Sequence, residues 1–167
     1  MPDTMEERPA RVFMTTAKRA IFILSLGLLL IHSSCGDDNT NQQSFIPDVP
    51  VSITINTDLP SYYHLKNLGG FEYLDGGYRG VLLIHNFDDL YYAIERTCSF
   101  ESDKECAHIF VDSMNFQLMC GQYVDTGFVE CCASKFTFDG NVLEPPAQLP
   151  LKLYRVTPNG GLLTISN

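Results

Sequence analysis

The sequence has few basic side chains and few histidines. Its 167 residues carry 11 Lys and Arg against 20 Asp and Glu, a formal net charge of −9, with four His and no Trp. Nucleic acid and anionic lipid headgroups repel a chain of this sign, so we expect neither as a partner. The length and a hydrophobic content of 45% fit one soluble domain with appendages.

Sequence motifs of common enzyme classes are also missing. The chain has no Gly-x-Ser-x-Gly, no His-Glu-x-x-His and no phosphate-binding glycine loop before a helix. The acidic clusters Asp88-Asp89 and Glu101 to Glu105 are typical of solvated turns. A Cys–His nucleophile pair is the enzymatic arrangement that the sequence leaves open. We therefore expect a role other than catalysis.

Long apolar runs are absent except for one near the N-terminus. The run "AIFILSLGLLLI", residues 20–31, follows basic residues and precedes the small residues before Cys35. It is too short to span a bilayer and has the length of a signal-peptide core. The segment resembles a bacterial lipoprotein signal, which implies that residues 1–34 are removed and that Cys35 carries lipid. Residues 35–50 are polar and contain prolines, as expected of a flexible tether.

The export signal indicates how the protein crosses the membrane and where it is located. Lys18-Arg19 is not an Arg-Arg pair, so we expect the general secretory route, by which the chain crosses the membrane unfolded. We expect a lipid-anchored protein of the bacterial cell envelope, either periplasmic or on the outer-membrane surface. Without residues 1–34 the chain has seven basic and seventeen acidic side chains, a net charge of −10.

Helical periodicity is lacking from Val51 onward, where apolar residues recur at every second position. Turn signals such as Asp-Gly-Gly and Pro-Asn-Gly-Gly separate these stretches, so we predict an antiparallel, all-β domain over residues 51–167. The predicted strands are 51–57, 71–74, 79–86, 91–96, 107–112, 115–119, 127–131, 136–138, 151–156 and 162–167.

Two stretches resemble a Rieske iron–sulfur domain. "GGYRGVLLIHNFDDLYYAIERTC", residues 76–98, is similar to the strand pair before the first ligand box, and "CCASKFTFDGNVLEPPAQLPLKLYRV", residues 131–156, is similar to the segment after the second. With its Ile-Pro-x-Val-Pro start, the region 46–167 resembles the Rieske-like lipoproteins of Bacteroidetes. Positions that keep the Rieske spacing are Ser134, Phe136, Gly140, Pro146, Ala147, Pro150 and Leu151.

The resemblance implies a fold and a set of ligand positions. It implies an antiparallel β-barrel or sandwich base with a small inserted cysteine-bearing subdomain over residues 98–140. A [2Fe–2S] cluster of this type needs two thiolates and two imidazoles. The matching positions hold Cys98, Phe100, Val129 and Cys132, so only two of them can bind a metal. His108 belongs to a Cys-x-His, but strand alternation turns it outward.

The remaining cysteines suggest a disulfide framework, because exported thiols are normally oxidised. The resemblance implies a bridge between Cys106 and Cys131, which leaves Cys98 and Cys132 to pair with each other or to stay adjacent. Cys120 is either a buried free thiol or the partner in another pairing. A zinc or copper site on Cys98, Cys132 and a third group is the metal alternative.

These observations lead to two hypotheses for the function. In the first, the protein is an envelope lipoprotein that keeps a Rieske-like fold without a cofactor and has a binding or structural role toward an unknown protein or glycan. Its tyrosine pairs, Tyr62-Tyr63 and Tyr91-Tyr92, would then contribute partly to recognition. In the second, the protein transfers electrons through a [2Fe–2S] cluster or a thiol–disulfide pair. We expect the first.

Overall fold

The computed structural model describes residues 45–167. The predicted signal peptide, Cys35 and most of the predicted tether lie outside this range. Within it, no helix has the length and apolar character needed to cross a membrane. The one helical segment of the described residues is a short 3-10 turn, η1 (Tyr63–Lys66).

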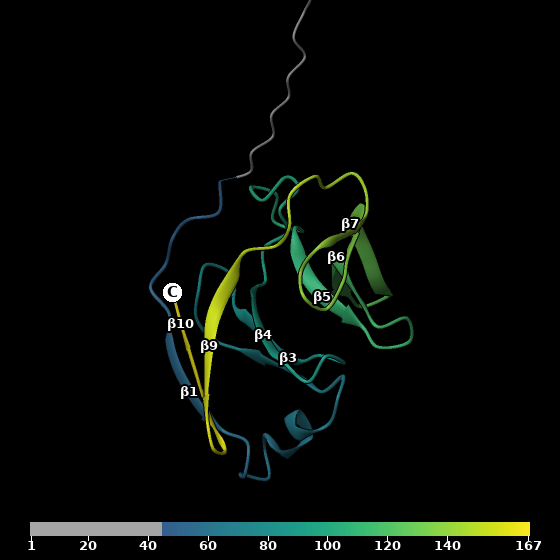
Figure 1. Cartoon of the computed structure of the whole chain (residues 1–167). Helices are drawn as coiled ribbons and strands as arrows, with labels where there is room; N and C mark the ends of the chain where they lie inside the picture. The colour runs from purple at the N-terminus through teal and green to yellow at the C-terminus, as the bar shows by residue number, and fades with distance from the viewer. Residues whose placement is uncertain (1–44) are drawn as a thin grey trace, which may run out of the picture. The chain divides into compact units, whose positions relative to one another are not determined.

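Six antiparallel strands form the larger sheet, here called the base sheet (Figure 1). The strand order is β1-β10-β9-β4-β3-β2, so the first and last strands of the described residues pair along their whole length. β9 pairs with β10 over most of its length and with β4 at its beginning. The bounds are β1 (Ser52–Asn56), β2 (Phe71–Leu74), β3 (Val81–His85), β4 (Tyr91–Glu95), β9 (Leu153–Asn159) and β10 (Leu162–Ser166).

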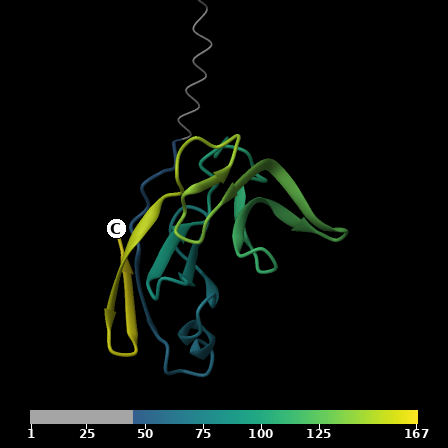
Figure 2. The same ribbon diagram turned by 45° about the vertical axis from the view of Figure 1, so that its right-hand side comes forward.

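Four further strands form a separate antiparallel sheet, here called the inserted sheet, in the order β5-β6-β7-β8. The chain enters it after β4 and returns to the base sheet at β9 (Figures 1 and 2). The predicted fold class, an all-β base with a small cysteine-bearing insertion, is confirmed. The bounds are β5 (His108–Asp112), β6 (Gln117–Val124), β7 (Gly127–Phe136) and β8 (Val142–Glu144).

Strand β3 and the second half of β4 are buried on both faces of the base sheet. All five residues of β3, Val81 to His85, are buried, which explains why this stretch is continuously apolar up to the histidine. Val81 and Leu83 pack with residues of β1 and β10, because the base sheet curls over this side and encloses a core. Leu82 and Ile84 point the other way, toward the inserted sheet.

The second core, here called the inter-sheet core, joins the base sheet to the inserted sheet. Leu82 and Ile84 of β3 contribute from one side, and alternate residues of β5 to β7 contribute from the other. Each large apolar side chain buried here stabilises the fold by about 1.5–3 kcal/mol. Two cysteines, Cys98 and Cys120, are buried members of this core, and Cys132 packs against it.

Residues 47–51 contact the end of the chain and the base of β9. The Lys152 ammonium lies 2.9 Å from the Asp48 carboxylate, and the Val51 amide donates a hydrogen bond of 2.8 Å to the Asn167 side chain. Asn167 also donates to Asp48 and to the Val49 carbonyl. The segment just before β1 is therefore held to the domain by polar contacts.

The structure corrects the strand prediction in three respects. Strands β6 and β7 run on to Val124 and Phe136, each five residues beyond the predicted end. The stretch 136–138 is not a strand of its own, because Phe136 ends β7 and the chain turns after it, with Gly140 in the left-handed region at φ 85°. The short strand β8 at 142–144 was not predicted. The tyrosine pair Tyr91-Tyr92 is split between the two cores, with each ring packing against one of them.

Candidate functional site

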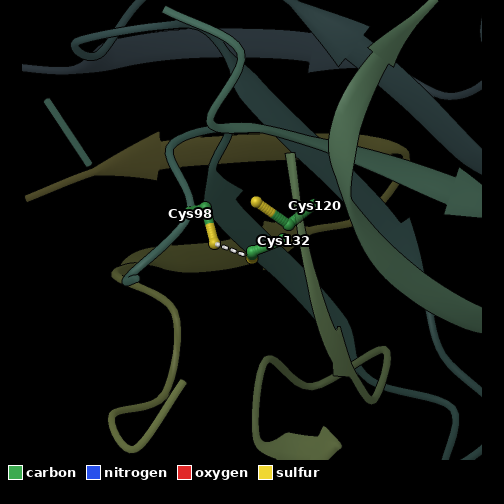
Figure 3. Close-up of side chains that lie close together, drawn as sticks. All are labelled: Cys98, Cys120 and Cys132. Carbon is green, nitrogen blue, oxygen red and sulfur yellow. Dashed lines mark hydrogen bonds between the residues drawn. The ribbon is translucent and has the colours of Figure 1, made fainter. Parts of the chain in front are cut away.

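Three cysteines from separate segments meet in the inter-sheet core (Figure 3). Cys98 follows β4, Cys120 lies on β6 and Cys132 lies on β7. Their sulfur atoms all lie within 4.8 Å of one another, and the Cys98 and Cys132 sulfurs are 3.8 Å apart. Cys98 and Cys120 are buried and Cys132 is half-buried. We call these three residues the thiol cluster.

A bulge in β7 brings Cys132 to the cluster. Met119 of β6 pairs with Lys135, but Gly121, two residues further on, pairs with Glu130. Four residues of β7, numbers 131–134, therefore lie opposite Cys120 alone. A bulge of this kind bends the strand and redirects side chains, and here it allows Cys132 to point inward beside Cys120.

Cys98 is positioned by a buried carboxylate three residues earlier. Glu95 is fully buried at the end of β4 and accepts four hydrogen bonds, so its charge is compensated. Two come from the side chains of Tyr154, at 2.6 Å, and Thr97, at 3.0 Å. The backbone amides of Tyr78 and Arg79 donate the other two, at 2.7 and 2.9 Å. These bonds fix the chain direction immediately before the cluster.

The segment after Cys98 is closed onto its surroundings by short polar contacts. The Cys98 amide donates to the Ala107 carbonyl at 2.9 Å, which closes the loop between them. The Ser99 hydroxyl donates to the Leu149 carbonyl at 2.6 Å, and the Ala147 amide donates to the Ser134 hydroxyl oxygen at 2.8 Å. The proline-rich segment before β9 is thus tied to both cysteine-bearing segments.

A disulfide joins these same segments next to the cluster. Cys106 and Cys131 are bonded, with a Cα–Cα separation of 5.4 Å that lies in the usual range for disulfides. Cys131 directly precedes Cys132, and Cys106 directly precedes the residue that pairs with Cys98. This is the pair that the Rieske resemblance implied. Cys98 and Cys132, the other predicted pair, lie side by side as thiols.

Hydrogen bonds make Cys132 the most acidic of the three thiols. Those from the Cys120 and Cys98 thiols hold the pKa of Cys132 well below its ordinary value, and the Ser134 hydroxyl and amide add to the effect against the opposing effect of burial. Cys132 is also the most exposed member of the cluster. A thiolate at neutral pH is therefore expected on Cys132.

The other two thiols are held protonated. For Cys98, the hydrogen bond with Cys120 lowers the pKa, but the hydrogen bond with Cys132, burial and the nearby Cys132 charge together raise it to about 12. For Cys120, hydrogen bonds to Cys132 and Cys98 and burial raise the pKa far above its usual range. The Phe100 amide also donates a hydrogen bond to Cys98.

The other two predicted ligand positions, Phe100 and Val129, have side chains that cannot bind a metal. Phe100 packs against the inter-sheet core with its ring, and Val129 lies on β7 with 46% of its surface exposed. Among residues 45–167, the only group of three or more His, Cys, Asp or Glu with metal-binding geometry is the thiol cluster itself. The donor set is therefore three sulfurs.

The described histidines lie elsewhere. His108 is on the half-buried face of β5 beside Phe110, away from the inward-facing Ile109, as strand alternation predicts. His64 and His85 belong to the base sheet region, where they contact Glu72 and Asp89. A [2Fe–2S] cluster of the Rieske type needs two imidazoles. The residues present do not fit that cluster.

The sequence missed one member of the site. Cys120 was expected to be a buried free thiol or to pair in an unspecified way, and its convergence with Cys98 and Cys132 was not predicted. A signal was available, since Cys120 lies two residues after the buried Leu118 and so shares its inward face. The bulge in β7 has no such signal, because no glycine or proline marks residues 131–134.

Comparisons with known proteins identify no family for the chain. No family model matches it, and no curated protein matches it. Among solved structures it is similar to the ferredoxin of carbazole 1,9a-dioxygenase from Nocardioides aromaticivorans IC177. The identity is 18% over 70% of this chain and 95% of that one, with a TM-score of 0.42. A likeness this low carries no argument about the site.

Proposed function

We propose that this chain is a lipid-anchored protein of the bacterial cell envelope. Its Rieske-like domain binds a ligand or partner and does not carry a [2Fe–2S] cluster. The observation that supports this is the donor set, which consists of the three sulfurs of Cys98, Cys120 and Cys132. The position two residues after Cys98, where an imidazole would be needed, holds Phe100, which is half-buried and packs against the inter-sheet core.

The strand geometry of the second ligand segment supports the same proposal. Val129 lies on the paired part of β7 and Cys132 lies three residues later in its bulge, whereas a Cys-x-x-His box must direct both of its side chains at one metal centre. Val129 is exposed, and its backbone lies opposite Gln122 of β6. No rotamer change of Val129 could supply a ligand, because its side chain is a hydrocarbon.

The proposed location is based on the sequence. The apolar run 20–31 before Cys35 and the polar segment after it have the pattern of a lipoprotein, and the resemblance to Bacteroidetes lipoproteins supports it. The domain itself adds one observation, since residues 47–51 are held to it by Lys152 and Asn167. The proposed tether would therefore begin at Cys35 and end close to residue 47.

The test is an assay of iron and acid-labile sulfide on protein purified from its native envelope, together with a visible absorption spectrum. We expect a protein without visible iron–sulfur absorption and with neither element in stoichiometric amount. Two irons and two sulfides per chain would overturn the proposal and make electron transfer the function. The control is the same assay on an authentic Rieske protein carried through the same purification.

A second candidate function is thiol–disulfide exchange, which is favoured by the 3.8 Å separation of the Cys98 and Cys132 sulfurs. In that reaction the two thiols form a disulfide and release two protons, and their two electrons reduce the disulfide of a partner protein to two thiols. Thiol trapping of whole cells decides this candidate. If the protein exchanges disulfides, a fraction of its molecules should contain a Cys98–Cys132 disulfide, and that fraction should change with the redox state of the cell.

A further inference from the structure

We infer that Cys98, Cys120 and Cys132 form a three-coordinate thiolate site for a soft monovalent metal ion, Cu(I). The inference rests on the proposed function, because it names the ligand of the same site. It goes beyond the earlier expectation of a metal on Cys98 and Cys132, since it identifies Cys120 as the third ligand and a specific ion.

The spacing of the sulfurs matches a trigonal site. With metal–thiolate bonds of about 2.3 Å, the length known for zinc, three sulfurs around one ion lie about 4.0 Å apart. The Cys98 and Cys132 sulfurs are 3.8 Å apart, and all three lie within 4.8 Å of one another. An ion could therefore be bound with shifts of less than about 1 Å, which side-chain rotation supplies.

The number and type of donors select the metal. Thiolates favour soft ions, and Cu(I) and Zn²⁺ are the usual candidates. A closed structural zinc site takes four protein ligands in a tetrahedron. Residues 45–167 offer three here, and the Ser134 hydroxyl beside Cys132 already accepts a hydrogen bond from the Ala147 amide. A three-sulfur site suits Cu(I) better than zinc.

Backbone and hydroxyl hydrogen-bond donors stabilise negative charge on two of the cluster sulfurs. The Phe100 amide donates to the Cys98 sulfur, and the Ser134 amide and hydroxyl donate to the Cys132 sulfur. Donors of this kind orient metal ligands and stabilise the thiolate form. They come from the closed loop after Cys98 and from the β7 bulge, so the backbone that shapes the site also supplies them.

The surroundings of the cluster favour the reduced ion. Ile109, Leu118 and Phe136, all fully buried, belong to the same core as the thiols and exclude water from one side. An apolar, all-sulfur environment disfavours Cu(II), which prefers nitrogen and oxygen ligands. The half-buried Cys132 leaves one side of the cluster open for entry of the ion. Binding displaces the thiol protons to solvent.

The experiment uses the full chain in detergent, with its thiols kept reduced under anaerobic conditions. Cu(I) is titrated in competition with a chromophoric Cu(I) chelator, and copper X-ray absorption reports the coordination number. We expect one Cu(I) per chain with three sulfur neighbours at about 2.3 Å. Zn²⁺ added in the same way should bind more weakly and should not displace Cu(I).

Two variants distinguish Cu(I) binding at the thiol cluster from Cu(I) binding by other sulfur atoms of the chain. Cys120→Ala removes the third ligand and should lower the Cu(I) affinity by at least about 100-fold, more than the loss of an outer hydrogen bond would. The control variant Met114→Ala removes an exposed sulfur from the turn between β5 and β6 and should still bind one Cu(I) through three sulfurs. Equal affinity in Cys120→Ala and the parent protein would overturn the inference.

A further measurement does not depend on whether Cys120→Ala folds. One equivalent of Cu(I) should protect Cys98, Cys120 and Cys132 of the parent protein from alkylation, as read by peptide mapping, and should raise its melting temperature. Free thiols that bind no Cu(I) would overturn the inference and leave the proposed function standing. Stoichiometric iron and sulfide would overturn the proposed function itself.

Discussion

Cys132 differs from the other two thiols of the cluster in its exposure and in the hydrogen bonds it receives. Cys120, Cys98 and Ser134 all donate to its sulfur, whereas Cys98 and Cys120 are buried and remain protonated. The thiolate is the reactive form of cysteine, so reactivity should follow this order. At the scale of single residues, the cluster is therefore an asymmetric group with one nucleophilic sulfur.

The first prediction concerns alkylation of the metal-free, reduced protein by iodoacetamide. Cys132 should be labelled at least about tenfold faster than Cys98 or Cys120. Because its pKa is lowered, Cys132 is already a thiolate at pH 5, and its rate should change little up to pH 8. An ordinary thiol gains about tenfold per pH unit in this range. Peptide mapping after timed quenching measures the rates.

Denatured protein provides the control for this labelling, because all three thiols should then react at similar, pH-dependent rates. Equal labelling of the three cysteines in the folded protein would contradict the hydrogen-bond arrangement. A Cys132 rate that rises tenfold per unit would contradict the lowered pKa.

Glu95 is the second residue whose role is local and testable. Its carboxylate accepts four hydrogen bonds in a fully buried position, two of them on each oxygen. In Glu95→Gln, an amide NH₂ replaces one carboxylate oxygen and faces the two hydrogen-bond donors that this oxygen accepted from. We therefore expect the free energy of unfolding to fall by about 3 kcal/mol. Chemical denaturation measures this loss, which should be accompanied by disorder of the Cys98 segment.

The matched control is Glu105→Gln, which removes the same charge from an exposed position. It should change the free energy of unfolding by less than about 0.5 kcal/mol. If both variants were equally stable, the buried carboxylate would not be holding the segment before Cys98. The sequence contained a signal for Glu95, since it occupies an inward position of a strand, on the same face as Ala93.

At the scale of elements, the site depends on how β7 meets β6 and how the Cys98 segment is fastened to both. The bulge opposite Cys120 admits Cys132, and the Cys106–Cys131 disulfide links the loop after Cys98 to the same part of β7. The alternation of apolar and polar residues predicted most strands of the two sheets. Alternation could not predict the bulge. It indicates which face of the sheet a side chain lies on, but it does not show where the pairing register between two strands changes.

The third prediction concerns this disulfide. Replacing both cysteines, in Cys106→Ser/Cys131→Ser, should lower the free energy of unfolding by about 3.5 kcal/mol, the chain-entropy value for a loop closed over 25 residues. Non-reducing peptide mapping of the parent protein should recover one peptide that contains both residues. A map that links Cys131 to Cys98 or Cys120 instead would contradict the structure.

At the scale of the whole molecule, the period-two alternation predicted the all-β class, and the Rieske resemblance implied the inserted cysteine-bearing subdomain. Alternating apolar stretches such as 162–167 predicted strands because one face of each is buried. The resemblance also placed Cys98 beside Cys132, but the sequence did not predict that Cys120 of β6 joins them in the inter-sheet core. Packing between sheets depends on the order of the strands and on their curl, which local periodicity does not determine.

The fourth prediction concerns Cys35, which lies outside the described residues. If Cys35 carries lipid, Cys35→Ser should accumulate as an unprocessed precursor and should no longer partition into the detergent phase. The measurement is phase partitioning with immunodetection, and Cys120→Ser serves as the control cysteine variant that should partition as the parent does. A Cys35→Ser protein that still enters the detergent phase would exclude lipid anchoring at this residue.

The most direct test of the central claim is anomalous diffraction at the iron edge, from crystals of protein purified from its own envelope without exposure to air. We expect no iron peak in the inserted sheet, with the Cys98, Cys120 and Cys132 sulfurs meeting as in Figure 3. Two iron peaks held there by four protein ligands would contradict it.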